Sequence, residues 1–236
     1  MGKISFKPGT MLNPVPVVMV TCGTMEEKNI ITIAWTGILN TEPPLTYVSV
    51  RKSRHSHGLI EKNGDFVINL CTEELAHAAD FCGVKSGKDL DKFKEQKLTA
   101  VQGDLVTCPM IEEAPVNLEC KVVEIKSFPT HDMFIGEIVK VHVDEKLLND
   151  NGKLQLEKAE LICYSHGEYF GIKKEPLGKF GYSIMKPKTK KRLENERKAT
   201  RRVGKSKPSK ETVPKGSPSK GRSQNGSAPK GKAGNK

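Results

Sequence analysis

The chain has 236 residues, of which 36% are hydrophobic and 28% are charged, and its formal net charge at pH 7 is +11. That charge is unevenly distributed, because residues 186–236 contain 18 Lys and Arg against 3 Asp and Glu and therefore carry +15. Residues 1–185 contain 21 basic and 25 acidic residues, a net charge of −4. The high isoelectric point is therefore a property of the C-terminal segment and does not indicate a polyanion as partner of the larger part.

The beginning of the chain predicts strands separated by a tight turn. Residues 15–22 form a continuous apolar run that is typical of a buried strand, and residues 30–36 predict a second strand. Residues 45–52 alternate between apolar and polar side chains, which predicts a third strand. Pro43 and Pro44 lie between the second and third strands, where they exclude a helix and predict an extended turn.

The next segment predicts two short helices around a strand. We expect a helix over 56–62 with Ser56 as its N-cap, ended by the Asn-Gly pair at 63–64. Residues 65–71 then predict a strand. Residues 73–82 predict a helix whose apolar residues share one face, as they do on helices that pack against a core.

The remainder of the larger part predicts mainly strands. Residues 83–115 read as loops, with a short helix over 91–96, and two long strands are expected over 116–127 and 134–144. The second of these alternates apolar and polar residues, as a half-buried antiparallel strand does. A turn at 151–152 and a last short strand over 161–164 follow. Many strands, short turns and few helices indicate a mainly β fold, a closed or nearly closed barrel.

The C-terminal segment differs from the rest in composition. It has no Phe, Tyr or Trp, and its last part repeats Lys, Pro, Ser and Gly. A short exposed helix is predicted over 188–202, and the chain after about Arg202 is predicted to be disordered, since it cannot bury enough apolar surface to offset the entropy of ordering. The expected division is therefore a domain over 1–185 and a basic tail over 186–236.

The six cysteines are scattered and form neither a C-x-x-C motif nor a cluster with histidines. Those at 22, 71 and 120 lie in apolar runs, where buried thiols behave as small hydrophobic side chains. We therefore expect no disulfide framework and no metal site. No secretory signal and no run long enough to span a membrane are found, which favours a cytoplasmic location. Neither a G-x-G-x-x-G nor a P-loop motif occurs.

The stretch from Asn29 to Asn69 contains the groups that a phosphorylated planar cofactor requires. The only tryptophan, Trp35, ends one predicted strand, and Arg51, Arg54 and a serine follow the next one. Arginine matches phosphate oxygens in two parallel hydrogen bonds, and a helix N-terminus adds unpaired N–H groups. The alternatives are that Trp35 is a core aromatic residue, Asn29 a turn residue and the arginines a solvated surface.

This stretch resembles the flavin reductase-like family, also called the flavoredoxin family, whose members bind FMN in a split β-barrel. Two further segments carry the resemblance. T-H-D-M-F-I-G-E-I-V at 130–139 is similar to the family's G-D-H-x-x-F-I-G-E-V pattern, with the Asp after the His instead of before it. Y-S-H-G-E-Y-F-G-I at 164–172 is similar to the family's C-terminal tyrosine–glycine segment. The similarity runs from about residue 14 to residue 181 and implies an FMN-binding split β-barrel with a few short helices.

The resemblance implies a set of cofactor-binding residues. By position in the family, one strand runs beside the flavin ring system, and the R-x-x-R-x-S pattern at 51–56 matches the phosphate-binding pattern. Ser49 would contact the ribityl chain or the flavin edge. The implied set is Asn29, Thr32, Ala34, Trp35, Ser49, Val50, Arg51, Arg54, His55 and Ser56.

His131 is the implied catalytic residue, because the family places the start of this strand, with Phe134, near the reactive face of the flavin. It would steer a nicotinamide or donate a proton near N5. The alternative is a structural or exposed histidine. Tyr164, Tyr169 and Phe170 would wall the flavin or the dimer interface, or simply close the barrel.

The implied function is hydride or electron transfer through bound FMN, with NADH, NADPH or a redox protein as the donor. Two alternatives are an NAD(P)H-dependent reductase of free flavin, and a scaffold with a flavin fold whose basic tail binds nucleic acid. The family implies a homodimer. A polycation binds phosphate backbones non-specifically through counterion release, so a polyanion is a candidate partner of the tail, with no membrane involved. The alternative is an inert, solubilising tail.

Overall fold

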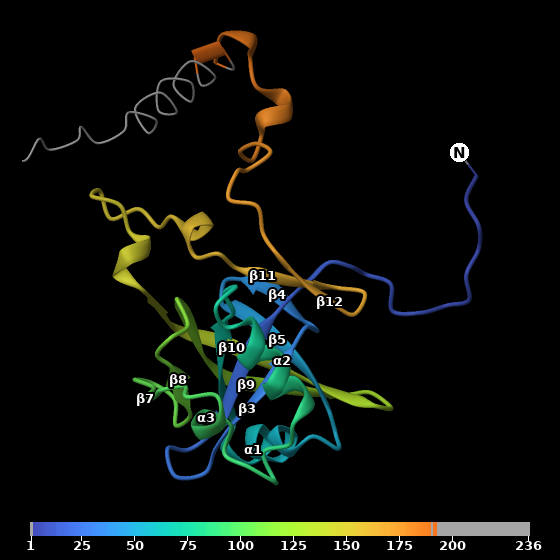
Figure 1. The fold of residues 1–236 in the computed structure, drawn as a ribbon, viewed down its shortest axis with the longest axis vertical. Helices are drawn as coiled ribbons and strands as arrows, with labels where there is room; N and C mark the ends of the chain where they lie inside the picture. Colours follow the sequence, from blue (N-terminus) through green and yellow to red (C-terminus); the bar gives the residue numbers. More distant parts are fainter. Residues whose placement is uncertain (1, 190, 193–236) are drawn as a thin grey trace, which may run out of the picture. The chain divides into compact units, whose positions relative to one another are not determined.

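Seven antiparallel strands form one sheet that closes on itself (Figure 1). In spatial order the strands are β3 (Lys28–Ile33), β2 (Val18–Gly23), β6 (Asp65–Leu70), β9 (Val116–Ser127), β10 (His131–Val143), β5 (Pro44–Arg51) and β4 (Thr36–Thr41). The two edge strands, β3 and β4, are consecutive in the chain and are joined by Ala34 and Trp35 alone. The edges of the sheet must therefore meet at these two residues, which makes the sheet a barrel.

This computed structural model describes residues 2–189 and 191–192. The chain divides into two compact units, Met1–Leu177 and Gly178–Lys236. The barrel and both cavities described below belong to the first unit. In the described part of the second, a 3-10 helix, η3, spans Tyr182–Ile184, and residues 187–189 and 191–192 are helical. The expected tail of 186–236, with its disordered region, lies largely outside the described residues.

The barrel interior is filled by alternate side chains of its strands. Phe66 and Phe134 are completely buried in this core, beside Val48 and Val50 of β5. Gly136 lies against Phe66, and a Cβ at this position would come within 2.7 Å of the Phe66 ring. Only glycine fits there, so the G in the F-I-G-E pattern is required by core packing.

Strand β2 is buried on both faces, which explains its continuous apolar sequence. One face contributes to the barrel core. The other face, with β3, packs against α2 (Ala76–Val84) and α3 (Lys92–Glu95) in a second apolar cluster that includes Met19, Ile30 and Phe93. The strand is thus covered from both sides.

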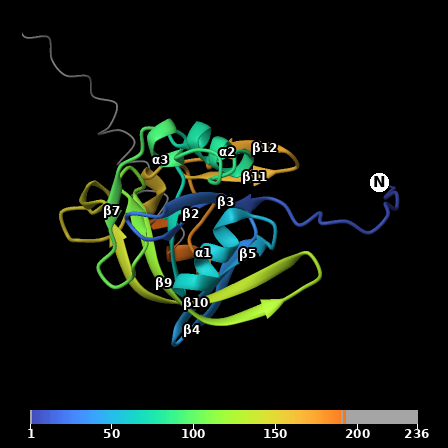
Figure 2. The same cartoon turned by 90° about the horizontal axis from the view of Figure 1, so that it is seen from below.

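Helix α1 (His55–Asn63) closes one end of the barrel, as Figure 2 shows. Its buried residues Leu59 and Ile60 belong to the barrel core. The helix ends at Gly64, which has the left-handed conformation (φ 72°) that glycine adopts without steric cost. Residues 51–55, just before and at its start, link β5 to the helix.

Smaller elements complete the first unit. The short strand β1 (Val15–Pro16) pairs with β11 (Ile162–Ser165), which pairs with β12 (Glu168–Gly171), and β7 (Ala100–Gln102) pairs with β8 (Pro109–Ile111). Two 3-10 helices, η1 (Glu145–Leu147) and η2 (Leu156–Lys158), lie between β10 and β11. Within the described residues, no helix is long and apolar enough to cross a bilayer.

The mainly β split-barrel class and most predicted elements are confirmed, with some differences. The strand expected over 30–36 ends at Ile33, and β4 follows it as the first arm of a hairpin with β5. The turn of this hairpin contains the prolines, with a cis bond between Glu42 and Pro43. Strand β10 begins at His131, three residues earlier than expected. Strands β7, β8 and β12 had no sequence prediction.

The prediction of Ser56 as N-cap is wrong. Helix α1 begins at His55, with Arg54 as the N-cap residue, and no side chain caps it. Ser56 lies inside the first turn, where its hydroxyl accepts a hydrogen bond from the side chain of Asn29 (2.8 Å) instead of one from the helix backbone. The hydroxyl therefore bonds a residue of β3 and does not cap the helix.

Candidate functional site

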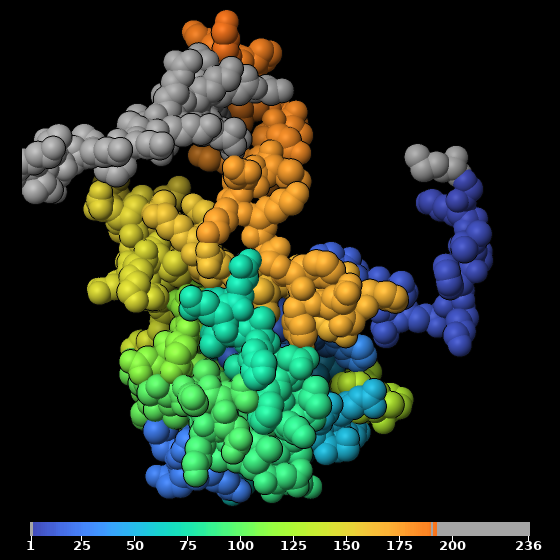
Figure 3. Space-filling view, viewed as in Figure 1, coloured from blue at the N-terminus to red at the C-terminus, as the bar shows by residue number. Residues whose placement is uncertain are grey.

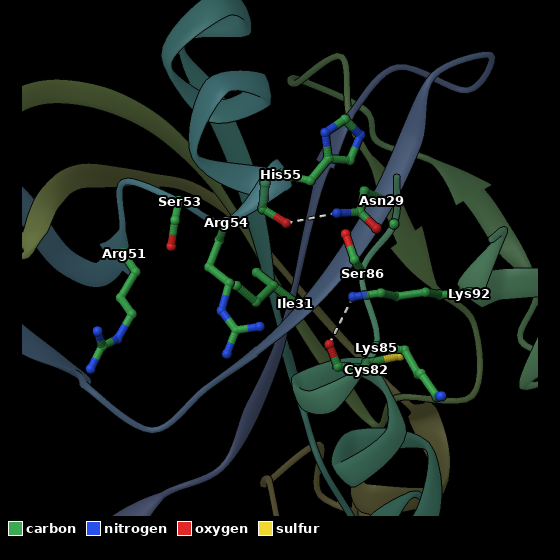
Figure 4. Close-up of a pocket in the computed structure, with 12 residues that line it drawn as sticks. Asn29, Ile31, Arg51, Ser53, Arg54, His55, Cys82, Lys85, Ser86 and Lys92 are labelled. Carbon is green, nitrogen blue, oxygen red and sulfur yellow. Dashed lines mark hydrogen bonds between the residues drawn. The ribbon is translucent and has the colours of Figure 1, made fainter. Parts of the chain in front are cut away.

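Two cavities adjoin on the first unit. The larger lies between β3, the start of α1 and the segment after α2, as Figure 4 shows. The smaller lies along residues 31–35, beside Ser49 and His131. The larger has a volume of about 510 Å³ and the smaller about 180 Å³. Ile31, Arg51 and Arg54 line both, so the two form one crevice. A volume of this size is typical of sites for small molecules and cofactors.

The larger cavity is strongly cationic. Arg51 and Arg54 reach it from the turn before α1, and Lys85 and Lys92 reach it from the segment after α2. Among the described residues that line the two cavities, none is acidic. The cavity is thus suited to an anion, and the arginines can bind it in the bidentate manner of a phosphate site.

The N-terminus of α1 opens into the same cavity. His55 and Ser56 of its first turn line the cavity, the helix has nine residues, and neither a side-chain cap nor an acidic residue occupies its first turn. The first N–H groups of a helix have no partner within the helix, and they carry the positive end of its dipole. Together with the arginines they form a site for a phosphate or another anion.

Asn29 connects β3 to this helix. Its side-chain nitrogen donates to the Ser56 hydroxyl (2.8 Å), and its other side borders the loop of residues 85–87. A Cβ at Gly87 would lie 2.1 Å from the Asn29 side-chain oxygen, so any larger residue there would displace the Asn29 amide. The loop therefore forms a wall of the cavity in direct contact with Asn29.

Lys92 is a buried lysine beneath the cavity. Its ammonium donates to the backbone carbonyls of Ile30 (2.7 Å) and Cys82 (2.8 Å), the second of which is drawn in Figure 4. Burial lowers its pKa, and the positive charge of Arg54 acts in the same direction. An ammonium has three N–H donors, so these two hydrogen bonds leave one for an anion in the cavity.

The smaller cavity has an aromatic wall. The rings of Trp35 and His131 lie 4.9 Å apart, tilted by 37°, and both line this cavity. Thr32, Ala34 and Ser49 line it as well. The hydroxyl of Thr32 donates a hydrogen bond to the carbonyl of Ala79 on α2, so its proton is not available to a ligand. Burial, reinforced by Arg51, lowers the pKa of His131, which keeps the ring neutral at pH 7.

The structure brings together nearly all of the residues predicted for the site. Asn29, Arg51, Arg54, His55 and Ser56 line the larger cavity. The exception is Val50, which is completely buried in the barrel core. Since successive side chains of a strand point to opposite faces, Ser49 and Arg51 face the cavities and Val50 between them faces the interior.

The other predicted wall residues do not line either cavity. Phe134 is buried in the barrel core. Tyr164 packs edge-on against Tyr169 at 5.5 Å, and the Tyr169 hydroxyl donates to Asp80 of α2. Within this unit these tyrosines join β11 and β12 to the helical side, while Phe170 is exposed.

Sequence reasoning missed the contribution of residues 82–92 to the site. Lys85, Ser86, Gly87 and Lys92 line the larger cavity, some 30 residues after the phosphate-binding pattern. The only local signal was the run V-K-S-G-K-D, which reads as an ordinary loop. Cys82 also lines this cavity, where burial raises its pKa to about 11 and keeps the thiol protonated.

The buried carboxylate of Asp132, next to His131 in β10, is the centre of a group of hydrogen bonds. The Asp132 carboxylate accepts hydrogen bonds from His57 (2.7 Å) and from the Ser127 hydroxyl (2.6 Å), and Lys52 lies 3.2 Å away. The hydroxyl of Ser127, followed by His57 and Lys52, lowers the pKa of Asp132 to about 2. The contact between Asp132 and His57 joins the start of β10, which carries His131, to the start of α1, which carries the anion-binding groups.

Within the described residues, one group of potential metal ligands, Asp104, Glu119 and His142, has its ligand atoms within 4.8 Å of one another. The Glu119 carboxylate already accepts hydrogen bonds from the amides of Asp104, Leu105 and Val106, and from His142 at 2.5 Å. Asp104 is paired with Lys140. These contacts explain why the three side chains lie close together: they hold the loop of residues 103–107 in place.

Comparison with known proteins gives a consistent result. The model of the flavin reductase like domain matches residues 10–173. A flavoredoxin of Desulfovibrio vulgaris (Miyazaki F) is 32% identical and superposes with a TM-score of 0.72, covering 78% of this chain and all of that one. An FMN-binding protein from Thermus thermophilus is 26% identical, with a TM-score of 0.64, covering 76% of this chain and 98% of that one. An uncharacterized protein of Archaeoglobus fulgidus is 35% identical over 159 residues, 67% of this chain and 88% of its own length.

Proposed function

The chain belongs to the flavin reductase-like family, and on this premise we propose that it binds FMN in the crevice and transfers hydride or electrons through it. The observation that carries the proposal is the division of the crevice into two chemically different halves. One half has Lys85 and Lys92 and a helix N-terminus, the other has Trp35 and His131, and Arg51 and Arg54 lie where the two halves join. FMN has the same division, with a phosphate at one end and a planar aromatic system at the other.

The residues of the cationic half fit the phosphate end. Arg51 and Arg54 supply planar donors, Lys92 supplies an N–H held in place by two carbonyls, and the first turn of α1 supplies backbone amides. Lys92 and the helix amides are fixed before a ligand arrives. Preorganised donors bind more tightly than mobile ones because less conformational entropy is lost on binding.

The residues of the aromatic half fit the flavin ring system. Trp35 offers a flat apolar surface, and Ser49 and Ala34 line the wall beside it. When bound, FMN supplies the redox chemistry, in which its ring takes up and releases a hydride or electrons. The task of the protein is to orient the ring and to limit access to it. Nδ1 of His131 is hydrogen-bonded to the Thr130 hydroxyl (2.8 Å), so only Nε2 is left to form a hydrogen bond with the flavin.

We favour a flavoprotein that keeps its FMN, as a flavoredoxin-type electron carrier, over a reductase of free flavin. The similarity of 32% to a flavoredoxin supports this choice. A redox protein or a nicotinamide nucleotide would be the electron donor, and a cytoplasmic homodimer is part of the same proposal. The scaffold alternative is less favoured because every group that a flavin phosphate requires lines one cavity.

The test is the visible absorption spectrum of the purified full chain, followed by anaerobic addition of NADH or NADPH. Flavin bands that persist with the nucleotides and bleach with a chemical reductant or a reduced redox protein would support the electron carrier. Bands that bleach with a nucleotide would identify a nicotinamide-dependent flavoenzyme instead. A colourless preparation that does not bind added FMN would refute the proposal.

A further inference from the structure

The turn between β5 and α1 carries both arginines of the crevice. Its backbone is closed by two hydrogen bonds, from the Arg54 amide to the Arg51 carbonyl (3.0 Å) and from the His57 amide to the Arg54 carbonyl (3.0 Å). Both arginine side chains are exposed, so the positions that they can reach depend on where this backbone is held. The amides of His55 and Ser56, which open the helix, belong to the same stretch of backbone.

One carboxylate holds this turn at both ends. One oxygen of Asp132, on β10, accepts a hydrogen bond from Nε2 of His57 (2.7 Å), and the ammonium of Lys52 lies 3.2 Å from the other oxygen. Lys52 directly follows Arg51, and His57 is in the first turn of α1. The segment between them is therefore tied to β10 on both sides, and Figure 3 shows the light-blue end of β5 beside the yellow-green hairpin of β9 and β10.

Asp132 is the fixed point of this arrangement. Within the sheet it lies in register with Val50 of β5 and Ser127 of β9, and the Ser127 hydroxyl donates to its carboxylate (2.6 Å). Asp132 and His57 are only 6% and 9% exposed. A buried carboxylate is stable only when its oxygens are hydrogen-bonded, and hydrogen bonds to an ionised acceptor are about twice as strong as neutral ones. The carboxylate therefore stays in the sheet, and the turn is held to it.

We propose that Asp132 is a positioning residue for the anion-binding half of the crevice. By holding Lys52 and His57 it fixes the backbone that presents the two arginines and the first amides of α1 to a phosphate. Asp132 lines neither cavity, so it acts through the turn and not on the ligand. The inference rests on the proposed function for the identity of the phosphate ligand. It gives a role to the Asp that follows His131, where the sequence departs from the family's pattern.

The first experiment measures amide hydrogen exchange in the full chain without flavin. His57→Phe removes the donor to Asp132 and keeps an aromatic ring. The amides of residues 54 and 57 should then exchange about tenfold faster, because opening the turn no longer breaks a hydrogen bond to a charged group. His57→Gln, which keeps an N–H group for Asp132, should restore slow exchange.

Ser127→Ala is the matched control. It removes a hydrogen bond to the same buried carboxylate, and the contact of Ser127 with the turn is a long one, from Lys52 (3.4 Å). It should lower the global stability in urea, as His57→Phe does, and leave exchange in the turn unchanged once this global loss is subtracted. If both variants accelerate exchange in the turn to the same extent, or neither does, Asp132 only stabilises the fold and the proposal is overturned.

The second experiment measures anion binding at the turn. Inorganic phosphate should slow exchange of the amides of His55 and Ser56. About tenfold more phosphate should be needed in His57→Phe than in the wild-type chain or Ser127→Ala, because the arginines and amides must then be ordered on binding. FMN should lose affinity for His57→Phe by a similar factor, and riboflavin, which lacks the phosphate, should lose much less. Anion affinity that is unchanged in His57→Phe, although its turn opens, would overturn the proposal.

These measurements separate the inference from the proposed function. Phosphate protection that is weakened in His57→Phe, in a chain that binds no FMN, would support the positioning role and refute the flavin proposal. FMN binding of equal strength in the wild-type chain and in His57→Phe would do the reverse.

Discussion

At the scale of single residues, Lys92 is the group in the crevice whose surroundings most favour an anion. A lysine that is 96% buried is costly to desolvate, and two backbone carbonyls offset only part of this cost. Arg54 nearby lowers the pKa of the ammonium further. An anion between these two charges would remove the repulsion. The proposed FMN phosphate would therefore gain more from this position than from an exposed lysine.

The arginines allow a prediction that separates phosphate binding from flavin binding. Arg51→Ala and Arg54→Ala should each weaken FMN binding about 10- to 100-fold, since hydrogen bonds to charged groups contribute about 1.5–3 kcal/mol. Riboflavin, which lacks the phosphate, should lose much less affinity than FMN, although both arginines also line the smaller cavity. The measurement is fluorescence titration with both flavins.

Lys88→Ala is the matched control, because Lys88 is exposed in the adjacent loop and does not line either cavity. If the arginine variants lose affinity for riboflavin and FMN to the same extent, the arginines do not hold the phosphate. Unchanged FMN affinity would exclude them from the site.

The hydrogen bonds to the Asp132 carboxylate predict a specific response to acid. The pKa of Asp132 is about 2 in the folded protein, below its value of about 3.9 in an unfolded chain. Its carboxylate therefore stabilises the fold above pH 4, and this contribution is lost as the pH falls toward 2. Asp132→Asn should lower the free energy of unfolding by about 2 kcal/mol at pH 7, and its stability should depend less on pH between 4 and 2.

Urea unfolding at several pH values measures this difference. The exposed carboxylate of Glu124, on the neighbouring strand β9, provides the control variant Glu124→Gln. Parallel pH profiles of the wild-type chain and Asp132→Asn would contradict the assignment of the low pKa to this residue.

The sequence located the residues of the crevice that lie close together in the chain, but not those brought in by the fold. The R-x-x-R-x-S pattern can be recognised in the sequence because its arginines and serine are groups that bind phosphate. Strand alternation alone could have removed Val50 from the predicted set. Lys92 and Gly87 could not be found, because their roles depend on contacts with Ile30 and Asn29 about 60 residues away. The pairing of His57 with Asp132 is equally non-local.

At the scale of elements, the loop of residues 103–107 is held by buried carboxylates. Glu119, completely buried on β9, accepts three consecutive amide N–H groups of this loop, and Asp65 accepts from the amide and hydroxyl of Thr107. Burial alone would raise the pKa of Glu119, but the hydrogen bonds from His142 and from the amides lower it. The loop is therefore fixed by charge and not by regular structure.

Glu119→Gln should release this loop. The neutral amide cannot accept all of these hydrogen bonds and presents its own N–H groups to donors, so we expect a loss of about 3 kcal/mol. Hydrogen exchange at residues 104–106 should become faster, while FMN binding should be retained because Glu119 does not line the crevice. Glu112→Gln, on the surface, is the control. Unchanged exchange at these amides would refute the anchoring role.

Elements with strong periodicity were predicted, and those that depend on tertiary pairing were not. Strands β6 and β9 and helix α3 lie where the apolar pattern and turn residues place them. Strand β4 was missed because a bulge between Ile38 and Asn40 breaks its alternation. Strands β7 and β8 have three residues each, too short for a pattern of their own.

At the scale of the whole molecule, charge separates an acidic body from a basic C-terminal segment. Residues 1–185 carry −4 and residues 186–236 carry +15. A body that is itself acidic has no general attraction for polyanions. Any binding of the full chain to a phosphate backbone should therefore come from the C-terminal segment.

This division predicts that polyanion binding and flavin binding can be removed separately. The full chain should bind duplex DNA with an affinity that falls steeply with salt, because each neutralised phosphate contributes a slope of about −0.9 in log K against log salt. A chain that ends at Met185 should lose this binding and keep FMN, since the crevice lies in the unit Met1–Leu177. A full-length chain with Gln in place of every Lys and Arg after Met185 controls for length, and it should behave like the truncated chain.

DNA binding that survives both changes would place the polyanion site on the body, where the arginines of the crevice would be the first residues to test. Loss of FMN on truncation, with DNA binding unchanged, would mean that the C-terminal segment contributes to the crevice and that the division by charge does not coincide with the division by function.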